Sequence, residues 1–590
     1  MVTKLFHRSS LLGAVSACLL AAPIDLHAAA GQVAYVAAVH TGGAGSVYLG
    51  PSYIVPATGD GYANLVVGDA TTGAVTHSSA ALNLTVSGYL YLGLRSGQGS
   101  YTLTGTGVLS TNVEEIGTSG TGTFTHDGGT NTIAGTLYLA RSIGSNGSYT
   151  LSGTGALSAN TVSVGDNGTG TFVQTGGTHT LTGSGDTLYV ARFENSRGRY
   201  ELSGGTLSAE NEEIGRSGTG VFTQSGGTNS VEKLFTVGNS QRGNGSYTLS
   251  GTGTLSAETE TIGGLGAGAF LQEGGTNTAV RVRIGNGSYS LNGGVLRTSE
   301  VEGSGLFSKF NFNGGVLQII QGPFIGFDFV ANTTVQAGGA KIDTNGIDFR
   351  ITSALGHDSS LGGIADGGLM KQGGDGILIL SGANTYTGST TINAGTLQVN
   401  GTHTVASGTA GSYVVNSGGT LGGTGTVNLA AVNQRVVVNS GGKLSPGASA
   451  GTLTLALGTG ALDISGAASG ANTGALVFEL AGVNASDKIS LTSGFLDIGA
   501  GALEFGDFSF TSLTGFAEGV YTLFDTNSAI NGSLADSGLS GAIGTKYGTI
   551  GLSGNGQDLL LTVVPEPSTY ALCILGVFAG FWRMRRRGGS

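Results

Sequence analysis

The side chains best able to do chemistry in this 590-residue chain are its carboxylates and the six histidines that lie beyond residue 31. Cleavage of a glycosidic bond, for example, needs carboxylates and a base that converge on one face of the fold. The histidines have neither the spacing of metal ligands nor that of a catalytic triad: His40, His77, His126, His179, His357 and His403. No irregular insertion gathers Asp, Arg and Lys. We therefore expect no catalytic residue, no metal site and no cofactor.

Acidic pairs are the remaining candidates for binding a cation. They recur at comparable positions of an internal repeat: Glu114 with Glu115, Glu212 with Glu213, and Glu258 with Glu260. Stacked carboxylates could attract cations or repel anionic glycans, but we favour a solvated outer face. Asp186 and Asp558 lie in segments that resemble a calcium-binding nonapeptide, which needs consecutive copies to complete each coordination shell. Two isolated matches predict no calcium site.

One short pattern recurs ten times between residues 99 and 315 and must position any site in that region. Each copy holds an aromatic residue that is followed at the fourth position by glycine. The aromatics are Tyr101, Phe124, Tyr149, Phe172, Tyr200, Phe222, Tyr247, Phe270, Tyr289 and Phe310. A period of about 23 residues indicates a solenoid.

Each unit alternates polar and apolar residues, as in Thr102 and Leu103, which is typical of a half-buried strand. Glycine-rich and Asn-Gly segments separate the strands. Two or three short strands with glycine-rich corners make one coil of a parallel β-helix, so we predict an all-β solenoid. Because successive coils pair at ~4.8 Å, the ten aromatics should form one internal stack.

The second residue after the aromatic alternates between leucine and a polar residue. The series reads Leu103, His126, Leu151, Gln174, Leu202, Gln224, Leu249 and Gln272. Tandem duplication of a two-coil segment explains this alternation, and that is the interpretation we favour. A ligand-binding column of glutamines is the functional alternative.

The N-terminus has the features of a secretory signal peptide over residues 1–30. Positive charges precede an apolar run over residues 11–22, which is too short to span a membrane. Ala28 and Ala30 fit a small-residue cleavage site. A lipoprotein-type cut at Cys18 is the alternative.

The C-terminus combines three features in order. Pro565, Glu566 and Pro567 precede an apolar run over residues 569–582, and a cluster of arginines follows: Arg583, Arg585, Arg586 and Arg587. This order resembles the PEP-CTERM sorting signal. The resemblance implies export by a Gram-negative-type cell, recognition by an exosortase, and transient contact with the inner membrane through residues 569–582. An ordinary tail anchor is the alternative.

Loss of both ends would make the chain more acidic. Six of the 25 basic residues and two of the 36 acidic residues lie in these ends, so the net charge would change from −11 to −15. The only two cysteines, Cys18 and Cys573, would also be lost. An acidic surface argues against binding to nucleic acid.

A different motif occupies residues 367 to 460. Residues 381–388 read Ser-Gly-Ala-Asn-Thr-Tyr-Thr-Gly, and residues 394–397 read Ala-Gly-Thr-Leu. Both segments resemble hallmarks of the autotransporter-associated β-strand repeat. The resemblance implies a parallel β-helix in an exported surface protein.

The sequence thus predicts seven regions. They are a signal peptide (1–30), a cap with the first coils (31–98), a ten-coil β-helix (99–318), an irregular β region (319–366), autotransporter-repeat-like coils (367–460), a C-terminal β cap or small β domain (461–563) and the sorting signal (564–590).

The leading hypothesis is an exported, non-enzymatic β-solenoid that is structural or adhesive at the cell surface or in an extracellular matrix. A polysaccharide lyase or hydrolase and a non-catalytic glycan-binding protein are the alternatives. The resemblance implies the secretion machinery and an exosortase as partners. Extracellular polysaccharide and other surface proteins are further candidates, whereas nucleic acid is not.

Overall fold

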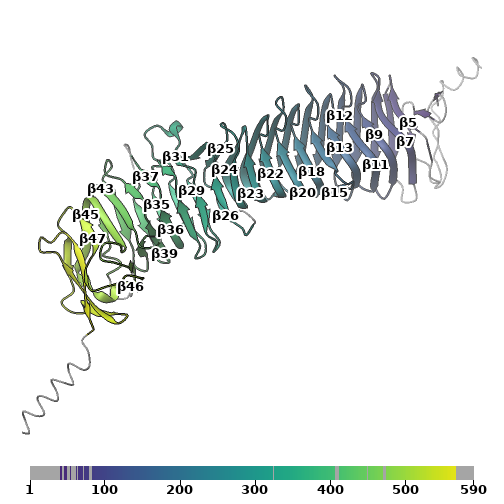
Figure 1. The fold of residues 1–590 in the computed structure, drawn as a ribbon. Helices are drawn as coiled ribbons and strands as arrows, with labels where there is room; N and C mark the ends of the chain where they lie inside the picture. The colour runs from purple at the N-terminus through teal and green to yellow at the C-terminus, as the bar shows by residue number, and fades with distance from the viewer. Residues whose placement is uncertain are drawn as a thin grey trace, which may run out of the picture.

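The computed structural model describes residues 40–42, 46–49, 53–54, 61–62, 64–70, 72–78, 83–322, 325–405, 411–447, 449–468 and 474–566. These residues form strands and two short 3-10 helices, η1 (Ser359–Leu361) and η2 (Phe505–Asp507). The strands wind into one elongated rod (Figure 1). Nearly all the pairings are parallel and join strands of successive coils, so the predicted parallel β-solenoid is confirmed.

The first column of strands carries the aromatic residues, and each strand pairs in parallel with the next. It contains β3 (Tyr53–Ile54), β6 (Thr72–His77), β8 (Gln98–Leu103), β10 (Thr121–His126), β12 (Asn146–Leu151), β14 (Thr169–Gln174), β17 (Arg197–Leu202), β19 (Thr219–Gln224), β21 (Asn244–Leu249), the first halves of β23 (Ala267–Ile284) and β24 (Gly287–Gly303), β25 (Lys309–Phe312), β28 (Asn332–Val335) and β31 (Leu355–His357).

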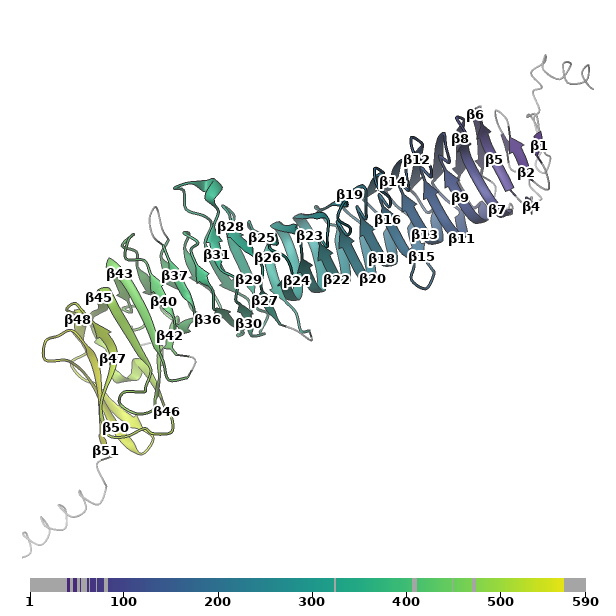
Figure 2. The ribbon, with the colours of Figure 1, turned by 45° about the horizontal axis from the view of Figure 1, so that its top comes forward.

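The rest of each coil is a longer strand that bends across two faces of the rod, and we call it the wide strand. Figure 2 shows these strands side by side. They are β5 (Asn64–Asp69), β7 (Asn83–Leu94), β9 (Val108–Ile116), β11 (Thr130–Leu139), β13 (Ala156–Val164), the pair β15 (Thr178–Leu181) and β16 (Thr187–Val190), β18 (Thr206–Ile214), β20 (Thr228–Val237), β22 (Thr254–Ile262) and the second halves of β23 and β24. At the N-terminal end, β2 (Ser46–Leu49) pairs with β5 and, antiparallel, with β1 (His40–Gly42), while β4 (Gly61–Tyr62) pairs with β7.

Parallel pairing continues through residues 319–366 and through the repeat-like region. The strands are β26 (Val316–Ile319), β27 (Gly326–Asp328), β29 (Ala340–Asp343), β30 (Phe349–Ile351), β32 (Leu369–Gln372), β33 (Ile377–Leu380), β34 (Ala383–Asn384), β35 (Thr390–Ile392), β36 (Gly395–Val399), β37 (Thr402–Thr404), β38 (Tyr413–Val415), β39 (Gly419–Gly423), β40 (Thr426–Asn428), β41 (Val436–Val438), β42 (Lys443–Pro446) and β43 (Thr452–Asp463).

The C-terminal end of the rod mixes parallel and antiparallel pairing. β44 (Leu476–Leu480) pairs with β46 (Phe508–Ser512), and β45 (Lys488–Leu503) pairs with β43, β47 (Gly519–Thr526) and β48 (Asn531–Leu534), all in parallel. β49 (Ser540–Ile543), β50 (Lys546–Leu552), β51 (Leu559–Pro565) and β47 then form an antiparallel sheet. The end of the rod is therefore closed by strands that run across the solenoid pattern.

Glycines at the corners of the coils allow the chain to turn without colliding with the next coil. Gly117 has a φ of 75°, and a Cβ there would lie 2.0 Å from the carbonyl oxygen of Asn146 in the following coil. Only glycine avoids both the left-handed strain and this contact. Glycine recurs after most of the wide strands for this reason, whereas Ala140 and Ala191 take the equivalent left-handed position in two coils.

The interior of the rod between residues 101 and 310 is built on the ten predicted aromatic residues. All ten are buried, and neighbouring rings lie parallel with centroids 4.6 to 5.3 Å apart. Offset-stacked rings at this separation add to the stabilisation from burial of apolar area. We call this series of rings the aromatic column.

Candidate functional site

The polar residues that alternate with leucine are buried beside the aromatic column. The hydroxyl of Tyr149 lies 2.8 Å from Nδ1 of His126, and that of Tyr200 donates to Oε1 of Gln174 at 2.7 Å. Gln224 and Gln272 accept from the tyrosines of the next coil in the same way. These side chains satisfy buried hydroxyls, so the glutamines are not open to a ligand.

One glutamate of each acidic pair contradicts the prediction of a solvated outer face. Glu114, Glu212 and Glu260 are fully buried, whereas Glu258 is exposed as predicted. The physical reason is a shift of register in the bend of the wide strand, for example between Ile133 and Leu137 of β11 where it pairs with β9. Such a shift inverts the alternation of inward and outward side chains.

An asparagine in the next coil holds each buried carboxyl. Nδ2 of Asn131 donates to Oε2 of Glu114 at 3.2 Å and to the Tyr149 hydroxyl at 3.4 Å. Two further copies have the same contacts: Asn229 with Glu212 and Tyr247, and Asn277 with Glu260 and Tyr289. Asparagine and glutamate are always 17 residues apart. The asparagines were not predicted from the sequence, although this constant spacing marks them.

Burial away from water controls how these acids titrate. It raises the pKa of Glu114, Glu212 and Glu260 from 4.5 to about 8, and the asparagine hydrogen bonds oppose this only in part. The glutamates are therefore neutral over most of the acidic pH range. They are part of the core and are closed to substrate.

Four of the six histidines are also core residues. His77, His126, His179 and His403 are buried, and each places Nδ1 within 2.9 Å of a tyrosine hydroxyl. Burial lowers the pKa of His126 and His403 to about 4 and that of His179 to about 3. The side chain of His40 lies outside the described residues. His126, His179 and His403 therefore act as neutral hydrogen-bond partners.

His357 lies beside the loop that contains η1. Its Nδ1 is 2.9 Å from Oδ2 of Asp366 and 3.0 Å from the hydroxyl of Thr387, while Nε2 is 3.2 Å from the Gly362 carbonyl. Asp366 also accepts backbone N–H groups, including that of Gly388 at 2.8 Å. Both ring nitrogens are thus engaged, and the cluster ties this loop to the coil of Thr387.

The two calcium-like segments use their aspartates for backbone contacts. Asp186 accepts from the backbone N–H of Glu210 at 3.4 Å, and Asp558 from that of Thr526 at 3.2 Å. Across the described ranges, no group of three or more His, Cys, Asp or Glu side chains is arranged to hold a metal ion.

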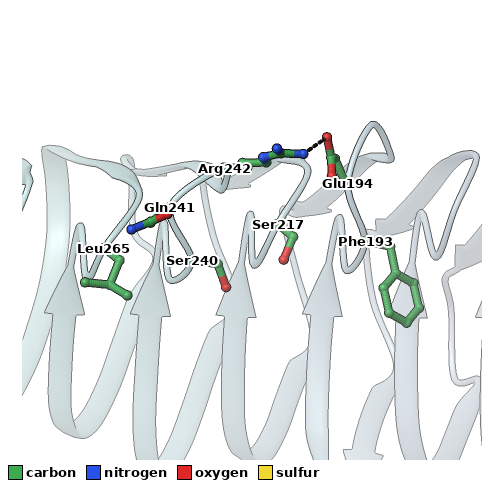
Figure 3. A pocket seen from close by; sticks show the side chains of 7 residues that line it. All are labelled: Phe193, Glu194, Ser217, Ser240, Gln241, Arg242 and Leu265. Atoms are coloured by element: carbon green, nitrogen blue, oxygen red, sulfur yellow. Dashed lines mark hydrogen bonds and ion pairs between the residues drawn. The ribbon is translucent and has the colours of Figure 1, made fainter.

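At one corner of the rod, each wide strand turns into the next strand that carries a ring of the aromatic column. One shallow trough lies on this corner (Figure 3). We call the turns at residues 117–120, 140–145, 165–168, 191–196, 215–218, 238–243 and 263–266 the loop edge. The trough has a volume of about 500 Å³ and is lined by Phe193, Glu194, Ser217, Ser240, Gln241, Arg242 and Leu265. The trough was not predicted from the sequence, because its lining comes from four turns of successive coils.

Only a small part of the two predicted terminal signals lies within the described residues. Pro565 ends β51 and Glu566 follows it. The remaining sorting-signal residues, Pro567 and the arginine cluster, and the predicted cleavage residues Ala28 and Ala30 lie outside the described residues, as does the apolar run 569–582. Within the part of the chain that the structure describes, no helix has the length and apolar character needed to cross a bilayer.

Comparison with known proteins identifies the repeat in the second half of the rod. Residues 371–399 match the family described as Passenger-associated-transport-repeat. The chain carries an autotransporter-type repeat. An 84-residue stretch, 14% of the chain, is 43% identical to an adhesin autotransporter, BmaC, of Brucella suis biovar 1 (strain 1330). The aligned stretch spans about 2% of the length of that relative. These findings confirm the predicted resemblance to autotransporter repeats, whereas the sorting signal stays a prediction.

In the structure, the matched repeat forms β32, β33, β34, β35 and β36. Its Lys371 is buried and donates from Nζ to the carbonyl oxygen of Ala394 at 2.9 Å. Burial lowers the pKa of this lysine to about 8. The hallmark Tyr386 is buried against His403, with ring centroids 4.0 Å apart. The hallmark residues therefore build coil-to-coil contacts.

Proposed function

We propose that this chain is an exported surface protein whose solenoid acts as an adhesive or structural rod outside the cell. The observation that carries this proposal is the autotransporter-type repeat inside an uninterrupted parallel solenoid. The adhesin relative adds support, since its name states an adhesive role. A solenoid suits that role because stacked coils present a long side surface.

We further propose that the protein is not an enzyme. Its most chemically distinctive groups, the buried glutamates and their asparagine partners, are closed within the rod. The His357 cluster is engaged in hydrogen bonds that tie a loop to the solenoid. Incubation of the purified chain with neutral and acidic polysaccharides tests this part, and cleavage of any of them would contradict it.

The proposed route to the surface uses the two terminal segments. The signal peptide would direct export, and the Pro565 motif with the arginine cluster would pass the chain to an exosortase at the inner membrane. Localisation of a tagged chain in a producing cell, with and without residues 564–590, tests the route. We expect surface or matrix labelling that changes to secreted or periplasmic label on truncation. Unchanged surface labelling would remove the sorting role and leave the adhesive proposal standing.

Adhesion needs its own measurement. Cells that display the chain should adhere to a test surface more than cells that display only residues 461–563. Equal adhesion of the two strains would contradict the adhesive role.

A further inference from the structure

The loop edge carries several exposed apolar side chains. Its seven turns carry Ile143, Phe193 and Leu265, which are 88%, 41% and 67% exposed. The equivalent turns farther along carry Leu306, Phe307 and Phe329, which are 89%, 69% and 77% exposed. Singly exposed apolar residues are ordinary on a protein surface, so the two that line the trough, Phe193 and Leu265, are the ones that bear on ligand binding.

The turns of the loop edge alternate in length. Residues 140–145, 191–196 and 238–243 form six-residue turns, and the turns between them at 165–168 and 215–218 have four. Each long turn is held by an internal bond, such as Ser196 N–H to the Phe193 carbonyl at 3.2 Å and Gly243 N–H to the Ser240 carbonyl at 2.7 Å. A preformed long turn therefore recurs every two coils, or every ~10 Å, along the loop edge.

The trough in Figure 3 runs across four successive turns, from the second long turn to the short turn that follows the third. Phe193 lies at one end and Leu265 at the other, and the ion pair between Arg242 and Glu194 crosses above Ser217. The floor and walls thus alternate apolar faces with hydroxyl, amide and charged hydrogen-bonding groups. That combination fits a ligand that has both C–H faces and many hydroxyls.

Charge at the loop edge decides between ligand classes. Every arginine in these turns has an acidic partner: Arg141 with Glu115 and Asp166, Arg192 with Asp166, Arg216 with Glu213, and Arg242 with Glu194. An anionic polymer or an acidic membrane would have to break these pairs and would meet a chain of net charge −11. A neutral ligand can use the paired groups as fixed donors and acceptors.

We infer that the loop edge binds a neutral linear polysaccharide, with sugar rings packed on Phe193 and Leu265 and hydroxyls bonded to the Arg242–Glu194 pair and the serines. This inference deepens the proposed adhesive function by naming its ligand class and its surface. A polymer is favoured over a single sugar because the trough extends across four successive turns of the rod. Two coils span a length comparable to that of a disaccharide in an extended glycan.

The test is calorimetric titration of the full chain with cellohexaose, laminarihexaose and chitohexaose. We expect one of these neutral hexaoses to bind, and Phe193→Ala to weaken its binding at least tenfold. Ser217→Trp, which fills the trough and removes no apolar contact, should also abolish binding. Ile364→Ala is the matched control, since Ile364 is 72% exposed but lies away from the loop edge.

Several results would overturn the inference. These are absence of binding to all three hexaoses, equal binding by the Phe193 and Ile364 variants, or selective binding of polygalacturonate or phosphatidylglycerol vesicles at this edge. Hydrogen exchange on each variant checks that the coils remain folded. Because adhesion is measured separately, a chain that adheres but binds no hexaose would overturn this inference and leave the proposed function intact.

Discussion

Phe172 stacks between Tyr149 and Tyr200, with ring centroids 4.9 and 4.6 Å away, and has no exposed surface. Replacement by alanine removes these contacts and leaves a cavity, so we expect Phe172→Ala to destabilise the surrounding coils by about 3–5 kcal/mol. Val173 is its half-buried neighbour on the outer face. Val173→Thr should cost much less. Hydrogen exchange on both variants measures the difference, and equal loss of protection would contradict the assignment of the strand faces.

The buried carboxyl of Glu212 should make stability depend on pH. Its pKa is raised to about 8 in the folded chain, so the folded state keeps a proton that the unfolded state releases above pH 4.5. The stability present below pH 4.5 is therefore lost as pH rises towards 8, by about 1.4 kcal/mol per pH unit for each such group. Glu212→Gln should remove one such slope and gain stability relative to wild type between pH 5 and 8.

Local hydrogen exchange in β18 and β20 measures this effect at several pH values. Glu258→Gln is the control, because Glu258 belongs to the same set of acidic pairs but its side chain is exposed. The groups that face Glu212 are Asn229 and the hydroxyls of Tyr200 and Tyr247. Burial raises the pKa of both tyrosines well above 10, so they stay protonated over this range. Parallel profiles for Glu212→Gln and wild type would show that the carboxyl is not buried as described.

At the level of the strand and its turn, two glycines of the loop edge allow the cost of backbone strain to be distinguished from the cost of a steric collision with the next coil. Gly117 and Gly144 have similar φ values of 75° and 81°. A Cβ on Gly117 would lie 2.0 Å from a backbone oxygen of the next coil, whereas no atom lies within 4 Å of a Cβ on Gly144. Gly144→Ala should cost about 1–2 kcal/mol from the left-handed conformation alone. Gly117→Ala should cost clearly more and should loosen the coil that follows.

Thermal unfolding combined with hydrogen exchange of β10 and β12 compares the two alanine variants. The same loss for both would mean that coil-to-coil approach does not require glycine at position 117. A larger loss for Gly144→Ala would contradict the geometry of the loop edge.

For the whole molecule, each coil contacts mainly its two neighbours, so the rod should behave as a one-dimensional stack. The pairings run in order from β2 and β3 to β43. At ~4.8 Å per coil, residues 47–455 should measure on the order of 85 Å along the axis. Small-angle scattering should give the distance distribution of an extended rod. A distribution with the symmetric shape of a compact sphere would contradict this prediction.

The sequence alone determined the solenoid and the identity of its core rings. Equivalent residues of stacked coils lie in register, so a pattern that recurs about every 23 residues directly predicts a column, as it does for Tyr101 to Phe310. The alternation of leucine with Gln174 and its equivalents was also visible as a two-coil repeat. Alternation within each strand was enough to place Phe172 inside and Val173 outside.

Only the tertiary structure decided the orientation of Glu114 and its partners. The bend within the wide strand shifts the register, and one shifted residue turns an outward side chain inward, which local alternation cannot predict. Likewise, Asn131 contacts Glu114 because both side chains turn into the interior of the rod from adjacent coils. The trough at Phe193 and Arg242 exists because coil stacking places turns that are far apart in sequence side by side. Sequence periodicity fixes which residues stack, whereas the path of the chain at each corner fixes which side they face.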